Sequence, residues 1–452
     1  MQAKKVQAQI RDMTQGNPLR LILAFAVPLF IGNIFQQVYN MVDTMVVGYH
    51  LGDQAIAAIG ATSSLYSLIV NFAGGLNSGY GIIVTQRFGA HNKKDMKQAI
   101  AGMMLLDLII SVGLSILAIS CLPWLMRFMN TPEAIFDQAY LYIAIIYSGL
   151  VATIGYNMFA AILRAMGNSR SPLYFLILSS LLNIGLDLLF VVTFEMGIAG
   201  AAIATVLAQC VSAVGCGVYT FRNYREYLPE KADFKVPGTM LKELLSTGLA
   251  MALMSCVVDL GNVTFQRVNN LLGETIIAAH AAARKLIVIL LQPLATLAVA
   301  NSTFTGQNWG AGKYDRIQST FKKVLLLEAG WGLFAAAIIY LFGAQLVRFT
   351  TGTSDPEIVG NAVMSLRIHF SMFPVLGVLF CTRNTMQAMG QKVAPVLSSC
   401  IELAMKILSA NVLIPKLGFL GTCITEPITW CLMVLFLMTV YFSKRKKIFA
   451  QA

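Results

Sequence analysis

Two acidic residues stand inside long apolar runs of this chain: Asp43 in FQQVYNMVDT (35–44) and Asp187 in LLNIGLDLLFVV (181–192). An aspartate at the centre of a membrane helix costs about 2.5–3.5 kcal/mol, so such a residue is expected to serve a function. Asp187 follows Asn183 by four residues and Asp43 follows Tyr39 by four, which places each pair on one helical face. Carboxylate and amide oxygens are ligands for a hard cation.

Thr205, in the next apolar run, adds a hydroxyl group at a similar depth. We therefore predict a loading site for H⁺ or Na⁺ at Asp43, Asn183, Asp187 and Thr205. Two facing carboxyl groups could also share one proton. The alternative interpretation is a buried, hydrogen-bonded cluster that only fixes helix packing.

Five further acids fall within apolar runs and are interpreted differently. Asp107 and Glu328 are expected nearer a membrane end, in structural roles. Glu402 precedes Lys406 by four residues, so the two can form an ion pair on one helix. The others are Asp259 and Glu426.

The elements that must position these residues are membrane helices. The chain has 452 residues, 57% hydrophobic and 12% charged, whereas soluble domains average about 25% charged residues. A span needs roughly 20 apolar residues. We count twelve runs of sufficient length: 19–46, 54–86, 98–122, 135–162, 171–193, 197–220, 243–266, 275–306, 320–347, 357–382, 393–415 and 418–442. The sequence therefore predicts an all-α polytopic membrane protein in a lipid bilayer.

The net charge of +12 is explained by the distribution of basic residues between the two sides of a membrane, so it does not indicate binding to nucleic acid. Lys and Arg gather at the N-terminus, in alternate loops and in the C-terminal SKRKK, while the opposite side has only Arg127, Arg267, Arg348 and Lys416. The positive-inside rule places both termini in the cytoplasm. We expect a cytoplasmic lead at 1–18 and a basic cytoplasmic tail at 443–452.

A weak internal repeat divides the chain into halves. LGDQAIAAIGATSSL (51–65) aligns with LGETIIAAHAAARKL (272–286), and GIAGAAIATVLAQC (197–210) aligns with GFLGTCITEPITWC (418–431). Each half holds six spans, so the halves enter from the same side as parallel repeats. We predict an N-lobe at 19–221, a cytoplasmic linker at 222–242 and a C-lobe at 243–442.

At this point the sequence resembles the multidrug and toxic compound extrusion (MATE) family, through VPLFIGNIFQQVYNMVDTMVVG, LRAMGNSRSP and LNIGLD. The resemblance implies a V-shaped protein with two pseudo-symmetric six-helix lobes. It implies a bacterial plasma-membrane antiporter that exports organic cations and drugs in exchange for H⁺ or Na⁺ by alternating access. Asp43, Asn183, Asp187 and Thr205 match the family's N-lobe cation site. Gln36, Tyr39, Tyr142 and Asn157 are assigned to the substrate cavity.

One branch of the family also uses acids in the seventh and tenth helices, and Asp259 lies near the first of these positions. The tenth helix here, MSLRIHFSMF (364–373), offers Arg367 and His369 but no carboxylate. We assign Asp259 to the substrate cavity, and the sequence leaves open whether the C-lobe binds a cation. Arg367 could instead pair with Asp259 or Glu402.

The sequence also bears on other classes of function. A flippase for a lipid-linked substrate, from the same wider superfamily, would need a cationic cavity, for which Arg284, Lys285, Arg367 and Lys406 are candidates. No enzyme motif such as GxxxxGK[ST], HExxH or GxSxG is present, so we expect no enzyme activity and no cofactor beyond the coupling ion. No filter-like repeated loop indicates a channel. The expected partners are small organic cations and the bilayer, and we expect a monomer.

Overall fold

The computed structural model describes the backbone of residues 10–450 and the side chains of residues 10–443. Within these residues the chain is helical and contains no strand. The predicted lead lies partly outside this part of the chain, as do the last two residues of the predicted tail.

The chain divides into two compact units. Unit 1 comprises Met1–Asp12 and Val27–Ala252, and unit 2 comprises Met13–Ala26 and Leu253–Ala452. Residues 222–242 therefore belong to unit 1. The lobe boundaries themselves remain a prediction.

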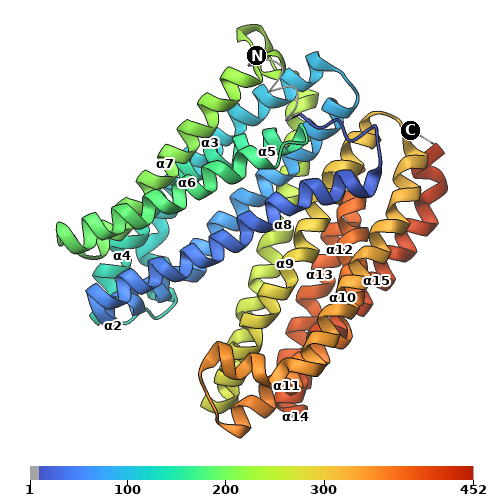
Figure 1. Cartoon of the computed structure of the whole chain (residues 1–452). Helices are drawn as coiled ribbons and strands as arrows, with labels where there is room; N and C mark the ends of the chain where they lie inside the picture. Colours follow the sequence, from blue (N-terminus) through green and yellow to red (C-terminus); the bar gives the residue numbers. More distant parts are fainter. Residues whose placement is uncertain (1–9, 451–452) are drawn as a thin grey trace. The chain divides into compact units, whose positions relative to one another are not determined.

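In unit 1 the helices follow the apolar runs of the sequence, and α5, α6 and α7 pack side by side (Figure 1). Unit 1 contains α2 (Pro18–Gly89) from Val27 onward, α3 (Lys93–Phe128), α4 (Glu133–Ser148), α5 (Leu150–Ala165), α6 (Arg170–Asp187), the π-helix η1 (Leu188–Thr193), α7 (Gly197–Asn223), the 3₁₀ helices η2 (Arg225–Tyr227) and η3 (Lys231–Phe234), and α8 (Gly238–Asn269) up to Ala252.

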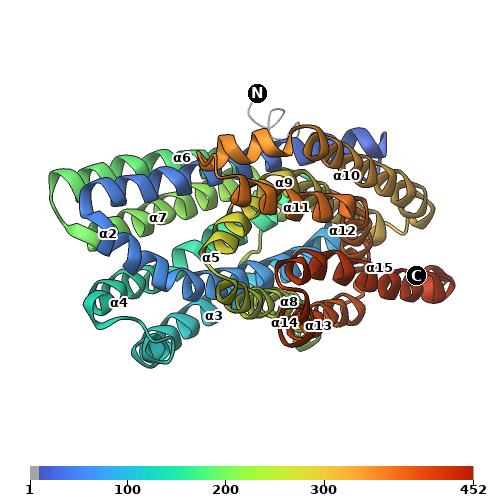
Figure 2. The same ribbon diagram turned by 90° about the horizontal axis from the view of Figure 1, so that it is seen from below.

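In unit 2, α9, α11 and α12 all pack against α10, and they group together in Figure 2. After α8, the chain forms η4 (Asn270–Leu272), α9 (Glu274–Gly310), α10 (Tyr314–Thr351), α11 (Pro356–Ser371), α12 (Phe373–Ala388), α13 (Val393–Leu408), the π-helix η5 (Ser409–Leu413), α14 (Ile414–Leu417) and α15 (Phe419–Ala450).

The predicted membrane spans are confirmed. Nine described helices are long and apolar enough to cross a bilayer, and two bent pairs, α4–α5 and α11–α12, bring the spans to eleven. The long helix α2 is two helices joined at Gly52, whose φ of 77° suits glycine far better than other residues. Counting α2 as two spans gives the twelve that the sequence predicts.

The doubled six-helix architecture is also visible in local geometry. Gly52 and its counterpart Gly273 both have positive φ and both separate the first two helices of a half. The pairs α4–α5 and α11–α12 bend by 45° and 48°. The π-helices η1 and η5 follow α6 and α13 directly. π-Helical turns are rare and are frequent at functional sites.

Residues 13 and 14, just before the first span, are held within unit 2 by hydrogen bonds. The amide N–H of Met13 donates to Gln307 Oε1 at 2.7 Å, and Asn308 Nδ2 donates to the Met13 carbonyl at 3.1 Å. Lys313 Nζ donates to the Thr14 carbonyl at 2.9 Å. These bonds hold residues 13 and 14 against the end of α9 and the start of α10.

Candidate functional site

The two acids that the sequence singles out are brought together in unit 1. Asp43 lies in the first part of α2 and Asp187 is the last residue of α6, and their carboxyl groups lie close enough to interact with each other. Two carboxylates cannot bond to each other unless one carries a proton, because an ionised carboxylate only accepts. A direct hydrogen bond between these two carboxyl groups would therefore require a bound proton.

This pair has no other support from hydrogen-bond donors. Oδ1 of Asp43 and both carboxyl oxygens of Asp187 are buried and have no further donor among the described residues. Both polar atoms of the Asn183 amide are likewise buried without a partner. Leaving a buried polar group unsatisfied costs about 1–3 kcal/mol. The arrangement leaves carboxyl and amide oxygens free to bind a proton or a hard cation.

Three tyrosines surround the acids. The phenol groups of Tyr39 and Tyr142, both assigned from the sequence, interact electrostatically with Asp43 and Asp187. Tyr66, in the second part of α2, interacts with Asp43 and was missed by sequence reasoning. The only sequence feature that could have indicated Tyr66 is its phenol group within an otherwise apolar span.

Thr205 is not joined to the acids by a hydrogen bond. Its hydroxyl donates to the Ala201 carbonyl at 3.1 Å, one turn earlier in α7. The oxygen keeps a lone pair with which it could accept a proton or contact a cation. Its assignment to the cation site remains a prediction.

A cavity of about 340 Å³ within unit 1 contains two of the predicted cavity residues, Gln36 and Asn157. Tyr66 lines the same cavity and interacts with Asp43, which connects the cavity to the acid pair, although neither acid is itself a lining residue. Its lining comes from α2, α5, α6 and α7 and is rich in amides and hydroxyls. Arg164 contributes the cationic group of this lining.

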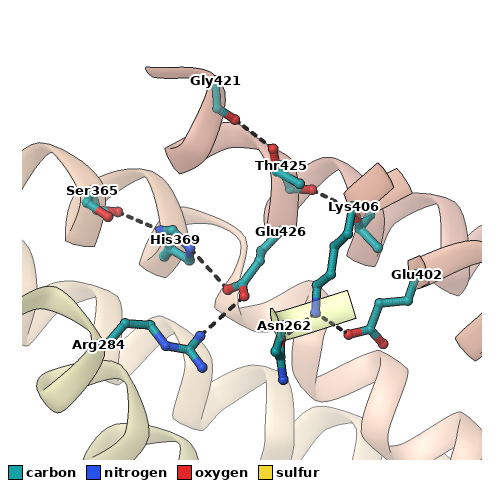
Figure 3. Close-up of polar contacts among 10 residues, drawn as sticks. Asn262, Arg284, Ser365, His369, Glu402, Lys406, Gly421, Thr425 and Glu426 are labelled. Atoms are coloured by element: carbon teal, nitrogen blue, oxygen red, sulfur yellow. Dashed lines mark hydrogen bonds and ion pairs between the residues drawn. The ribbon is translucent and has the colours of Figure 1, made fainter. Parts of the chain in front are cut away.

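Unit 2 contains a different polar cluster, drawn in Figure 3. The Glu426 carboxyl on α15 accepts a bond from Arg284 Nη1 of α9 at 3.2 Å, and its other oxygen lies 3.2 Å from Nε2 of His369 on α11. The predicted ion pair of Glu402 and Lys406 is confirmed at 2.8 Å.

Lys406 also donates to Asn262 Oδ1 of α8 at 2.7 Å. Asp259, three residues before Asn262, is half-buried and has Cys256 as an electrostatic neighbour. The contacts of the described residues do not pair Arg367 with Glu402, and its pairing with Asp259 stays a prediction. Its guanidinium lies over the Tyr340 ring at 5.5 Å, while Glu402 is taken by Lys406.

The repeat relates these two regions. The alignment of 197–210 with 418–431 matches Thr205 with Glu426, and the preceding helices match Asn183 with Lys406. Asp43 and Asp187 correspond to Thr264 and Ala410, so the acid pair is confined to unit 1.

Comparison with known proteins identifies the family. A family model described as MatE matches residues 28–189 and 250–410, which is most of the chain. The chain is 28% identical over 383 residues to "Probable multidrug resistance protein YpnP" of Bacillus subtilis, covering 84% of each protein. It is 26% identical over 439 residues to "Probable multidrug resistance protein YoeA" of the same organism, covering 95% of this chain and 94% of that protein.

Solved structures share the fold over the whole chain. The structure described as MATE in the bent conformation superposes with a TM-score of 0.89 at 24% identity, covering 99% of this chain and 98% of that one. The paired six-helix halves and the family match over both of them lead to one conclusion: this chain is a multi-pass membrane protein that belongs to the MATE family of transporters.

Proposed function

We propose that this protein is a secondary active exporter, which moves small organic cations and drugs outward across the plasma membrane in exchange for H⁺ or Na⁺. The single observation that carries the proposal is the Asp43–Asp187 contact, whose oxygens lack other donors. The names of the relatives as multidrug resistance proteins support the substrate class.

The coupling follows from competition for negative charge. A proton between the two carboxyl groups, or Na⁺ held by Asp43, Asn183 and Asp187, reduces the charge available to a cationic substrate. The cavity that adjoins the pair is the place where that substrate binds, at Gln36, Asn157 and Tyr66. Loading of the ion therefore favours release of the substrate, and alternating access of the two lobes places the exchange on opposite sides of the membrane.

Both ions would use the same oxygens, so one experiment can identify the ion. Purified protein is reconstituted in liposomes, and ethidium efflux is followed under an imposed pH gradient or an imposed Na⁺ gradient. We expect efflux under one gradient and its loss in Asp43→Asn and Asp187→Asn. The matched control is Asp137→Asn, which neutralises an exposed acid on α4.

Two results would contradict the proposal. Unchanged efflux in both Asp43→Asn and Asp187→Asn would remove the acid pair from the mechanism. Absence of both ethidium binding and efflux under either gradient would count against the drug-exporter function itself.

The flippase hypothesis gains no support from the charges. Its cationic cavity would need unpaired basic groups, yet Glu426 accepts a bond from Arg284 and Lys406 bonds to Glu402. Arg367 lies over Tyr340. The cytoplasmic location of both termini and the monomeric state are retained as parts of the proposal.

A further inference from the structure

The cluster of Arg284, His369 and Glu426 in unit 2 has no part in the exchange proposed above. Its members come from three separate helices, α9, α11 and α15, and converge on the Glu426 carboxyl (Figure 3). His369 and Glu426 are 3% and 12% exposed. A buried group of this kind needs a reason, because ionisable residues within membrane spans are costly.

The hydrogen bonds determine how many protons the pair holds. Nδ1 of His369 lies 2.8 Å from the Ser365 carbonyl oxygen, which can only accept, so Nδ1 must carry a hydrogen. Nε2 of the same ring lies 3.2 Å from Glu426 Oε2. A neutral ring with its proton on Nδ1 would present a lone pair to an ionised carboxylate at that distance. The contact is a hydrogen bond only when one more proton lies between Nε2 and Oε2.

We propose that His369 and Glu426 form a proton-binding site of unit 2, and that the bound proton ties the last turn of α11 to α15. The proton resides on Nε2, giving an imidazolium–carboxylate pair, or on Oε2, giving a carboxylic acid that donates to the ring. Both forms contain the same number of protons. Loss of this proton replaces a hydrogen bond by repulsion between two lone pairs.

The two ion pairs nearest the site are balanced without this proton, because Arg284 and Lys406 offset Glu426 and Glu402. Arg383, 4.0 Å from Glu402, adds a further positive charge. The bound proton therefore adds to an excess of positive charge in this group of five. Other ionisable groups on the surrounding elements include His280 on α9, Glu328 and Tyr340 on α10, Arg367 on α11, Cys381 and Arg383 on α12, Cys423 on α15 and Asp259 on α8.

His280 provides a second, independent observation. Its side chain is buried at 7% exposure, and its Nδ1 has no hydrogen-bond partner among the described residues. It interacts electrostatically with Glu426, His369 and Arg284. A buried polar atom without a partner calls for an explanation. In the tautomer that leaves Nδ1 unprotonated, this nitrogen is free to accept a proton beside the pair.

The position of His369 links the proton to a bend in the chain. His369 is in the last turn of α11, and its carbonyl accepts from Met372 N–H at 3.1 Å, where the 48° bend toward α12 begins. In unit 1 the repeat places Ser148 at the position of His369 and Thr205 at that of Glu426. Neither residue titrates in this range, so the proton-dependent tie is specific to the bend of unit 2.

Glutamine variants distinguish the effect of the bound proton from the effect of the hydrogen bond that joins α11 to α15. In Glu426→Gln the carboxamide N–H₂ donates to Nε2 of a neutral His369, and in His369→Gln the amide donates to the Glu426 carboxylate. Both variants keep a hydrogen bond between α11 and α15 without the extra proton. His369→Leu removes the bond altogether.

The test uses full-length protein labelled with ¹⁵N-histidine in lipid nanodiscs, titrated between about pH 5 and pH 8. We expect the wild-type Nε2 signal of His369 to report a bound or hydrogen-bonded proton that is lost as the pH rises. A proton held on Glu426 appears instead as a carboxylic-acid stretch in the infrared difference spectrum. In Glu426→Gln the carboxylic-acid band disappears, and Nε2 keeps a hydrogen bond from the carboxamide that is not lost as the pH rises.

The matched control is His50, on α2, whose Nδ1 also bonds to the carbonyl four residues earlier, Val46, at 3.0 Å. His50 is exposed and has no carboxylate contact in the described structure, so its titration is expected to be the same in wild type and Glu426→Gln. The His369 signal is assigned from its absence in His369→Gln.

Thermal stability gives a second measurement. We expect the wild-type unfolding midpoint to fall as the pH rises through the titration of the pair, whereas both glutamine variants lose this dependence. His369→Leu lacks the tie at every pH. A structural role alone would leave the wild type and the glutamine variants with the same pH dependence.

The proposal is overturned if wild-type His369 keeps an unprotonated, unbonded Nε2 across the titration and no carboxylic-acid band is present. The wild-type spectra decide this even where a variant fails to fold. Because neither measurement requires transport, failure of this proposal and failure of the exporter function are distinguishable.

Discussion

The two units place related residues in opposite electrostatic situations. In unit 1, Asp43 and Asp187 face each other, and the Asn183 amide beside them has no partner. In unit 2, the counterpart of Asn183 is Lys406, whose ammonium group bonds to Glu402 and Asn262. At this position of the repeat unit 1 has a neutral amide, whereas unit 2 has a cation built into the chain. In terms of the proposed function, this difference assigns ion loading by the acid pair to unit 1 alone.

The largest effect is expected from removing the internal cation of unit 2. Lys406→Met leaves Glu402 buried and 4.0 Å from Arg383, its remaining basic neighbour. Breaking a buried ion pair in this way costs about 3–5 kcal/mol. The measurement is the free energy of unfolding in mixed micelles. The double variant Lys406→Met, Glu402→Met should recover most of the loss, and a double variant as unstable as the single one would contradict the ion-pair explanation.

The reciprocal exchange places a cation in unit 1. In Asn183→Lys an ammonium group takes the position next to Asp187 and competes with the coupling ion. Hydrogen bonds to charged groups contribute about 1.5–3 kcal/mol, so ion affinity should fall by about 10–100-fold. Ion-driven ethidium efflux should be lost while the protein remains folded. Asn183→Leu is the control for loss of the amide alone, and equal transport in the lysine and leucine variants would show that charge is not the cause.

The shared backbone geometry should respond equally in both units. Gly52 and Gly273 have φ of 77° and 98° with extended ψ, a region that is almost restricted to glycine. Replacement by alanine should cost about 1–3 kcal/mol at each position. Thermal unfolding of Gly52→Ala and Gly273→Ala compares the two, with Gly185→Ala, inside α6 and free of close neighbours, as control. Strain at only one of the two sites would show that the halves differ in backbone as well as charge.

The smallest effect is expected at Thr205. Its hydroxyl bonds within α7, so Thr205→Val should lower ion affinity by no more than about 0.5–1.5 kcal/mol, the contribution of one ordinary hydrogen bond. Concentration dependence of the driving ion in the efflux assay measures this. Thr220→Val removes the same kind of intrahelical bond further along α7 and serves as control. A complete loss of transport in Thr205→Val alone would give this hydroxyl a direct role in holding the ion.

The sequence predicts the helices and their number well, because apolar length and charge distribution depend on the bilayer. The sequence also predicts that Asp43 and Asp187 belong to one site, because both are acids within apolar runs of the same half and each shares a helical face with another polar residue. The partners of Glu426 do not follow, because they depend on how α9, α11 and α15 rotate against one another. The bends between α4 and α5 and between α11 and α12 fall at Gly149 and next to Pro374, residues that favour a break, whereas the π-helices leave no clear pattern in the sequence.

The fastening of residues 13 and 14 to α9 and α10 has a consequence for the order in which the protein is made. The partners of Met13 lie 294 and 295 residues further along the chain. A ribosome therefore delivers the first span to the membrane long before Gln307 and Asn308 exist. The hydrogen bonds of residues 13 and 14 can form only after the eighth span has been synthesised. An affinity tag or truncation near Met13 would therefore disturb the late steps of biogenesis more than the early ones.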